Sequence, residues 1–101
     1  MLLALLFAPA AHAAGSCVMG PAPQTVKVFF APQGAAWALW FEGDEAERVP
    51  CSKLADPRAD LRLDCGDDPE EFTTLLVKGS QGLWLDGQGE EIATLRQCRL
   101  R

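Results

Sequence analysis

The chain has 101 residues, with 14 acidic and 9 basic side chains and a net charge of −5 at pH 7. An acidic chain is repelled by nucleic acid, so we expect no nucleic-acid partner and regard a basic protein as the better electrostatic match. The chain has no tyrosine, and its one histidine, His12, lies in the N-terminal segment discussed next. These counts leave the rest of the chain without Ser-His or Cys-His catalysis and without most metal sites, so we expect neither an enzyme nor a cofactor.

The first segment, residues 1–13, is an apolar run that ends in small residues, with Ala11 and Ala13 at the spacing of an A-x-A cleavage site. This pattern predicts a secretory signal peptide and a periplasmic or secreted protein. The run is too short for a transmembrane segment, which needs roughly 20 apolar residues. Cleavage would leave 14–101 as a single small β domain. A lipid anchor at Cys17 is the alternative, although Ala14 and Gly15 do not fit a lipid-attachment sequence.

Seven short segments that follow are rich in β-branched, aromatic or aliphatic residues and are separated by Gly, Pro and acidic turns. Such segments at regular spacing predict antiparallel strands. We expect strands near Thr25 to Ala31, Ala36 to Glu42, Ala46 to Pro50, Leu61 to Cys65, Phe72 to Lys78, Gly82 to Asp86 and Glu91 to Cys98. A helix could form only around residues 51–61, where Pro57 limits it to a turn or two.

An internal duplication is the next prediction. The pentads LWFEG (39–43) and LWLDG (83–87) fall at matching places when Cys17 is aligned with Cys65. The repeats would cover 17–51 and 65–98, joined by a bridge over 52–64. The fold class predicted is therefore all-β, a small antiparallel β-barrel or sandwich built from two three-stranded repeats. The alternative is that two ordinary hairpins share turn chemistry, because Gly and Pro recur wherever chains turn.

Each pentad should form the middle strand of its repeat. Side chains alternate along a strand, so Leu39 and Leu83 should face one side and Trp40 and Trp84 the other. If the duplication holds, the two pentads should superpose. We expect both tryptophans in the core, with an exposed contact role as the alternative. The glycine that ends each pentad should allow a tight turn.

Four cysteines in an exported chain predict two disulfides, for which three pairings exist. In a three-stranded repeat the chain enters at one end and leaves at the other, so the two cysteines that flank one repeat should lie too far apart to bond. We therefore expect Cys17 to pair with Cys98 and Cys51 with Cys65. The first bridge closes the longer loop and should stabilise more.

The bridge is the candidate partner-binding loop. Ser52, Lys53, Arg58 and Arg62 lie there between two cysteines, in an otherwise acidic chain. A loop constrained by a Cys51–Cys65 disulfide would bind well because its ordering is already achieved. A plain connector between the halves is the alternative. The acidic runs at 42–47 and 67–71 occupy predicted turns, where charges are usually solvated, so we expect no catalytic carboxylates in them. We also expect no calcium site at 86–91, which lacks the alternating oxygen ligands of a calcium-binding loop.

The sequences CVMG, TVKVFF and LWLDGQGEEIATLRQC together resemble, in outline, the periplasmic and membrane-bound inhibitors of c-type lysozyme. The resemblance implies an exported antiparallel β-barrel whose first and last cysteines are linked. The Ser-Gly and Tyr inhibitory segment of that family has no counterpart here, so no functional residue is carried over. Two functions are expected: an exported non-catalytic binding module, such as an inhibitor of a basic hydrolase, or a structural, envelope-associated β domain without a specific ligand.

Overall fold

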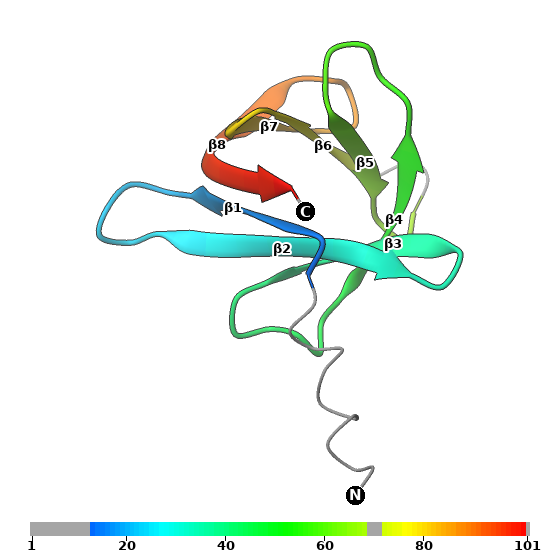
Figure 1. Cartoon of the computed structure of the whole chain (residues 1–101), viewed down its shortest axis with the longest axis horizontal. Coiled ribbons are helices and arrows are strands. Elements are labelled where there is room, and N and C mark those ends of the chain that lie inside the picture. The colour runs from blue at the N-terminus through cyan, green and yellow to red at the C-terminus, as the bar shows by residue number, and fades with distance from the viewer. Residues whose placement is uncertain (1–12, 69–71, 101) are drawn as a thin grey trace, which may run out of the picture.

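The protein, described by a computed structural model over residues 13–68 and 72–100, contains strands and no helix in those residues (Figure 1). The strands are β1 (Gly15–Met19), β2 (Val26–Gln33), β3 (Ala36–Phe41), β4 (Val49–Leu54), β5 (Leu61–Cys65), β6 (Thr73–Lys78), β7 (Gln81–Leu85) and β8 (Glu91–Leu100). The all-β prediction is confirmed. The segment at 51–61, where a turn of helix was allowed, instead forms parts of two strands and their connection.

The strands form a closed antiparallel barrel in which each strand pairs with its sequence neighbours and β8 pairs with β1. Of the two predicted architectures, barrel and sandwich, the barrel is therefore the one adopted. Closure leaves no sheet edge with unpaired backbone groups. Each half supplies four strands, rather than three, to the barrel. The strand missing from the prediction is β1, whose sequence GSCVM is short and opens with two small residues.

The barrel interior is filled by aliphatic and aromatic side chains from every strand. In the first half Val28, Phe30 and Leu39 are at most 1% exposed, and in the second half Leu63 and Val77 are fully buried. These residues pair across neighbouring strands on one face of the sheet, for example Phe30 with Leu39. The alternation in the sequence therefore produces one continuous core rather than two separate ones.

Two disulfides lie in this interior, Cys17–Cys98 and Cys51–Cys65, which is the predicted pairing. They join β1 to β8 and β4 to β5, the two places where the halves of the chain meet. The premise of three strands per repeat was wrong, but four strands have the same consequence. Cys17 and Cys51 lie on the outer strands of one half, separated by β2 and β3.

Residues 39–41 of the first pentad lie on β3 and residues 83–85 of the second lie on β7, and equivalent residues face opposite sides of the barrel wall. On β3, Leu39 is in the core at 1% exposure, whereas its counterpart on β7, Leu83, is 37% exposed on the outer surface. Trp84 packs against the core and stacks on Phe41 with ring centroids 5.7 Å apart. Trp40 lies on the outside and is nevertheless 3% exposed. The expectation that equivalent pentad residues share a face is thus wrong.

The turns after the pentads also differ. Gly43 adopts a φ of 90°, as predicted for the glycine that follows the acid. After the second pentad it is Gly89, with a φ of 84°, and not the pentad's own Gly87 that takes the left-handed conformation. There the Asp86 carboxylate accepts hydrogen bonds from the backbone N–H groups of Gln88 and Glu90, both at 2.9 Å, and shapes a longer turn.

Candidate functional site

The predicted binding loop forms the β4–β5 hairpin, whose connection spans residues 55–60. Cys51 and Cys65 face each other across the two strands and are bonded, so the hairpin is constrained as expected. In Figure 1 the connection between β4 and β5 extends away from the rest of the barrel. The structure thus places the four candidate residues on one rigid hairpin.

Both arginines of this hairpin are held by carboxylates of the same hairpin. Asp56 accepts from Arg58 at 2.8 Å and from Arg62 at 3.2 Å. Asp64 accepts two bonds from Arg62, both at 2.9 Å, and a third from the Thr74 hydroxyl at 2.9 Å. The Arg58 side chain beside Asp56 holds the pKa of that carboxyl well below its usual range. The arginine charges are therefore balanced inside the hairpin.

Ser52 and Lys53 are both exposed. The Lys53 ammonium lies 5.4 Å from the ring centroid of Trp37, where the π-face of the indole attracts it. The β4–β5 connection is also fixed to the β6–β7 turn, because the Asp60 carboxylate accepts a hydrogen bond from the backbone N–H of Gly79 at 2.8 Å. The hairpin is thus rigid but close to electrically neutral, which gives it little attraction for a charged partner.

Acidic residues gather instead at one end of the barrel, which we call the acidic end. In an antiparallel barrel with neighbouring strands joined in sequence, the connections that follow odd-numbered strands all emerge at the same end. Among the described residues, those connections carry Glu42, Asp44, Glu45, Glu47, Asp67, Asp68, Asp86 and Glu90. The only basic residue in the same described connections is Arg48.

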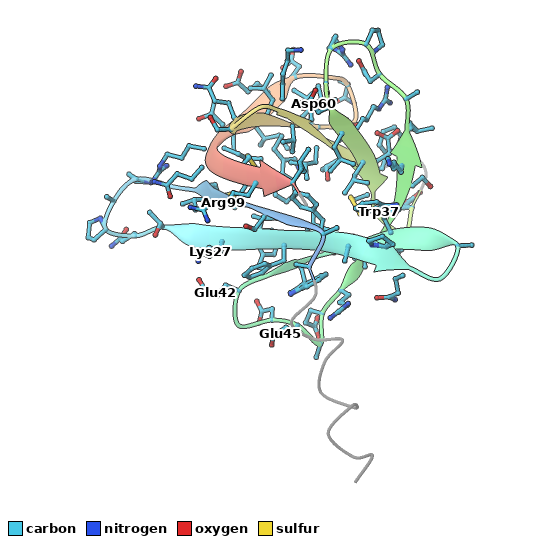
Figure 2. The ribbon with its side chains drawn as sticks, in the orientation of Figure 1. Lys27, Trp37, Glu42, Glu45, Asp60 and Arg99 are labelled. Atoms are coloured by element: carbon cyan, nitrogen blue, oxygen red, sulfur yellow. A yellow bond between two sulfur atoms is a disulfide. The ribbon has the colours of Figure 1, made fainter. Side chains whose placement is uncertain are left out.

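The β3–β4 connection is the most acidic of these and has an ordered backbone. Glu42 donates its backbone N–H to the Lys27 carbonyl at 2.9 Å, and successive turns join Asp44 to Phe41 and Glu47 to Asp44, each at 2.9 Å. All four acidic side chains are exposed. Figure 2 shows Glu42 and Glu45 on this connection, beneath β2 and β3. The backbone is therefore organised by internal bonds while the carboxylates remain available to a partner.

Arg48 fixes this acidic connection to the barrel wall. Its guanidinium lies 3.9 Å from the ring centroid of Trp40, which in turn stacks on Phe29 with centroids 5.9 Å apart. It also donates to the Glu45 carbonyl at 3.3 Å and to the Gln33 side chain at 3.2 Å. This cluster explains why Trp40 is buried although it lies outside the barrel core.

Sequence reasoning assigned the acidic run at 42–47 to a solvated turn and missed its role as part of a larger surface. The missing signal was topological. The connections that follow odd-numbered strands share one end because sequence neighbours pair antiparallel, and that count requires β1, which the sequence did not predict. Arg48 could have been noticed as the cation that directly follows the acidic run at 42–47, eight residues after Trp40.

Metal-binding groups and membrane-spanning helices were both sought among the described residues. In this part of the chain no group of three or more His, Cys, Asp or Glu side chains is placed to hold a metal ion. No helix over the same residues is long and apolar enough to cross a membrane. The Cys17 sulfur, considered above for a lipid anchor, is bonded to Cys98. The predicted signal peptide lies outside the described residues except for Ala13.

Comparison of the chain with protein-family models, with curated proteins and with solved structures finds no match. Its function is therefore inferred from its own residues.

Proposed function

We propose that this chain is an exported, non-catalytic binding module whose acidic end takes a basic protein, and that a basic hydrolase such as a c-type lysozyme is the class of partner it inhibits. The observation that carries the proposal is the charge separation. Exposed carboxylates occupy the connections that follow odd-numbered strands, whereas the arginines of the β4–β5 hairpin are paired with Asp56 and Asp64. Clustered charge of one sign speeds the encounter with an oppositely charged protein.

The β3–β4 connection supplies the rigid part of this surface. Its backbone bonds and the Arg48–Trp40 contact order it before any partner arrives. A preordered loop loses little conformational entropy on binding, so more of the interaction energy appears as affinity. Two disulfides at the places where the halves meet suit an oxidising compartment, which supports export.

The alternative function is a structural, envelope-associated domain without a specific ligand. The observation that favours it is the closed barrel with a disulfide at both meeting places, an arrangement that serves stability alone. In that case the acidic end would do no more than keep the protein soluble.

Titration of the mature protein with a purified c-type lysozyme, by calorimetry and by a cell-wall lysis assay, tests the proposal. We expect binding and inhibition that weaken as salt rises. A variant with Glu42→Gln, Asp44→Asn, Glu45→Gln and Glu47→Gln should bind at least about tenfold more weakly, since several charge interactions of a few tenths of a kcal/mol are lost together.

Two controls accompany that variant. Exchanging the acids at Asp44→Glu and Glu45→Asp preserves the charge and should preserve binding. Lys53→Gln tests the β4–β5 hairpin and should leave binding unchanged. If Lys53→Gln weakens binding while the four-acid variant does not, the hairpin and not the acidic end is the contact. Absence of binding to lysozyme and to other basic hydrolases would support the structural alternative.

A further inference from the structure

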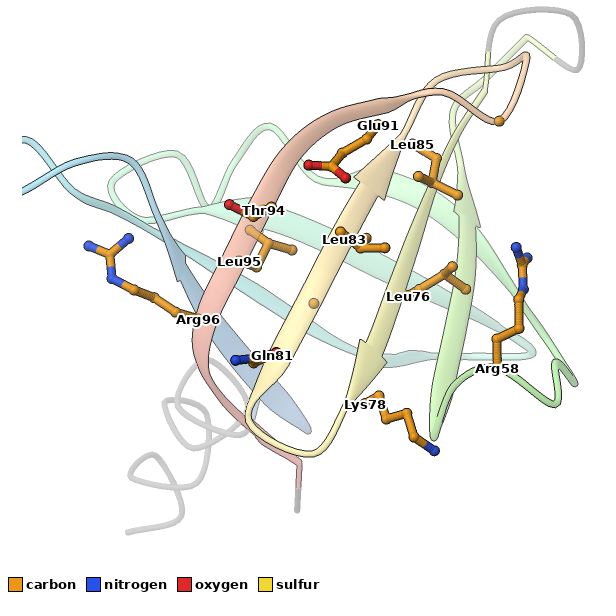
Figure 3. Close-up of a pocket in the computed structure, with 12 residues that line it drawn as sticks. Arg58, Leu76, Lys78, Gln81, Leu83, Leu85, Glu91, Thr94, Leu95 and Arg96 are labelled. Atoms are coloured by element: carbon orange, nitrogen blue, oxygen red, sulfur yellow. The ribbon is translucent and has the colours of Figure 1, made fainter.

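A second surface, on the outside of β6, β7 and β8, has a different chemistry from the acidic end. It is a shallow groove of about 1010 Å³, shown in Figure 3, with leucines on its floor and charged residues at its rim. We call it the outer groove. Leu76, Leu83 and Leu85 on its floor lie on the outer face of the barrel wall, whereas Leu95, which also lines it, belongs to the core cluster.

The groove is ordered in rows that run across the strands. Leu76 of β6 pairs with Leu83 of β7, which pairs with Thr94 of β8. One row further toward the acidic end, Thr74 pairs with Leu85, which pairs with Glu91. In the opposite direction Lys78 pairs with Gln81 at the β6–β7 turn. Polarity therefore changes along the strands from cationic, through apolar, to acidic.

The floor is apolar and open to solvent at its centre. Leu83 is 37% exposed, while Leu76 and Leu85 beside it are 7% and 9% exposed. In Figure 3, Leu83 lies between Leu76 and Thr94, with Leu85 above it. Residues of one face repeat about every 6.7 Å along a strand, so about 13 Å separates the Lys78 row from the Leu85 row. This is a length of apolar surface that one extended alkyl chain can cover.

The rim at the β6–β7 turn is positively charged. Lys78 and Arg96 line the groove there, and no ion pair or side-chain hydrogen bond within residues 13–68 and 72–100 involves either of them. Arg58, which also lines the groove, already forms an ion pair with Asp56. Glu91, the acid of the groove, lies at the opposite end beside Leu85 (Figure 3). Lys78 and Arg96 thus flank one end of an apolar floor, and in Figure 3 their side chains extend to opposite sides of it.

From this arrangement we infer that the outer groove binds a single-chain anionic amphiphile, with its carboxylate or phosphate head between Lys78 and Arg96 and its alkyl chain along Leu76, Leu83 and Leu85. The head gains charge-assisted hydrogen bonds, and the chain covers the exposed leucine. Glu91 at the far end opposes the reverse orientation, because it would meet the anionic head. The inference does not depend on the acidic end or on a basic partner.

Decanoate, used below its micelle concentration, is the probe. Titration of the mature protein, followed by NMR of the leucine methyl groups, should give saturable shifts at Leu76, Leu83 and Leu85. The double variant Lys78→Gln, Arg96→Gln should bind at least about tenfold more weakly, because it loses the charge-assisted hydrogen bonds to the anionic head. Leu83→Ser should also weaken binding, and its exposed position keeps the fold intact.

Matched controls use exposed residues outside the groove. Leu54, 42% exposed on β4, is the counterpart of Leu83, and Lys27 on β2 is the counterpart of Lys78. Leu54→Ser and Lys27→Gln should leave decanoate binding unchanged. Decanol, which has the same chain without the charge, should bind at least about tenfold more weakly than decanoate.

Four results obtained without vesicles would overturn the inference. Three of them concern the ligand: decanol binds as well as decanoate, the NMR shifts do not saturate, or the control variants lose binding. The fourth is a dimer of the wild type in sedimentation that becomes a monomer in Leu83→Ser. The last result would make the groove a contact between two copies. Binding to vesicles of anionic phospholipid that decanoate does not displace would assign the surface to a bilayer instead. Unchanged lysozyme binding in the Lys78, Arg96 variant keeps this test separate from that of the proposed function.

Discussion

Strands β3 and β7 end in nearly the same three residues, LWF and LWL, yet equivalent residues face opposite sides of the barrel wall. Leu39 fills the core and Trp40 lies outside under Arg48, whereas Leu83 faces solvent and Trp84 packs inward on Phe41. Both patterns satisfy the alternation of a strand, and the neighbours decide which set is buried. Val28 and Phe30 of β2 place the odd-numbered residues of β3 inside, while Leu75 and Val77 of β6 place Trp84 inside. Local sequence thus determines that every second residue is buried, but not which of the two alternating sets is buried.

The largest expected effect comes from separating the two halves at the places where they meet. Replacing Cys17 and Cys98 by alanine should lower the free energy of unfolding by about 4.5 kcal/mol, and replacing Cys51 and Cys65 by about 3 kcal/mol. The difference follows from sequence separations of 81 and 14 residues. Urea denaturation followed by tryptophan fluorescence measures both. If loss of the Cys51–Cys65 disulfide cost more than loss of Cys17–Cys98, the loop-closure entropy of the unfolded chain would not be what sets the stabilisation by these disulfides.

The two pentad leucines test the difference in phase directly. Leu39→Ala should cost about 2 to 5 kcal/mol because it opens a cavity in the core. Leu83→Ala should cost about 0.5 kcal/mol, as at other exposed positions. Urea denaturation with the disulfides intact decides between them. Equal losses would mean that both leucines are buried and that the pentads share a face after all.

A smaller effect should distinguish Trp40 from the other tryptophans. In a double-mutant cycle with Arg48→Gln and Trp40→Leu, we expect a coupling energy of about 1 kcal/mol from the cation–π contact. The matched pair Lys53→Gln and Trp37→Leu should couple less, because the cation lies 5.4 Å rather than 3.9 Å from the ring centroid. Zero coupling at Arg48 would remove the anchor proposed for the acidic connection.

The smallest expected effect is on how the free energy of unfolding changes with pH in the acid range. The pKa of Asp56 is lowered in the fold, first by its bond to Arg58, so its carboxyl binds a proton more readily when the chain is unfolded. The stability that it contributes is therefore present above its unfolded pKa of about 4 and is lost as the pH falls toward the folded pKa. Between pH 4 and pH 2 the stability of Asp56→Asn should fall less steeply than that of the wild type. Parallel curves would contradict the role of this carboxylate.

Much of the fold was predictable because strand signals are local. The segment Leu61 to Cys65 was predicted with the observed bounds, and five further strands were placed within about two residues of their observed bounds. The fourth strand begins at Val49 rather than Ala46, because the turns that join Asp44 to Phe41 and Glu47 to Asp44 use up the preceding residues. Whether the halves derive from a duplication stays a prediction.

The candidate sites were less predictable because they depend on which strands become neighbours. The sequence pointed to Arg58 and Arg62 as exposed cations, but Asp56 and Asp64 lie near enough to balance them. The outer groove was missed for a similar reason. Leu83 was expected on the same face as Leu39, but the pairing of β6 with β7 places it on the outside together with Leu76 and Leu85.

Pairing of β8 with β1 means that the sheet runs through every strand and returns to its start. Gly15 lies opposite Leu100 in that pairing, so the two ends of the domain are spatial neighbours. The barrel has no structural reason to prefer one strand as its beginning. A short linker between these ends, with new termini opened in the exposed connection at 55–60, would give a circularly permuted chain that folds to the same barrel and retains both disulfides.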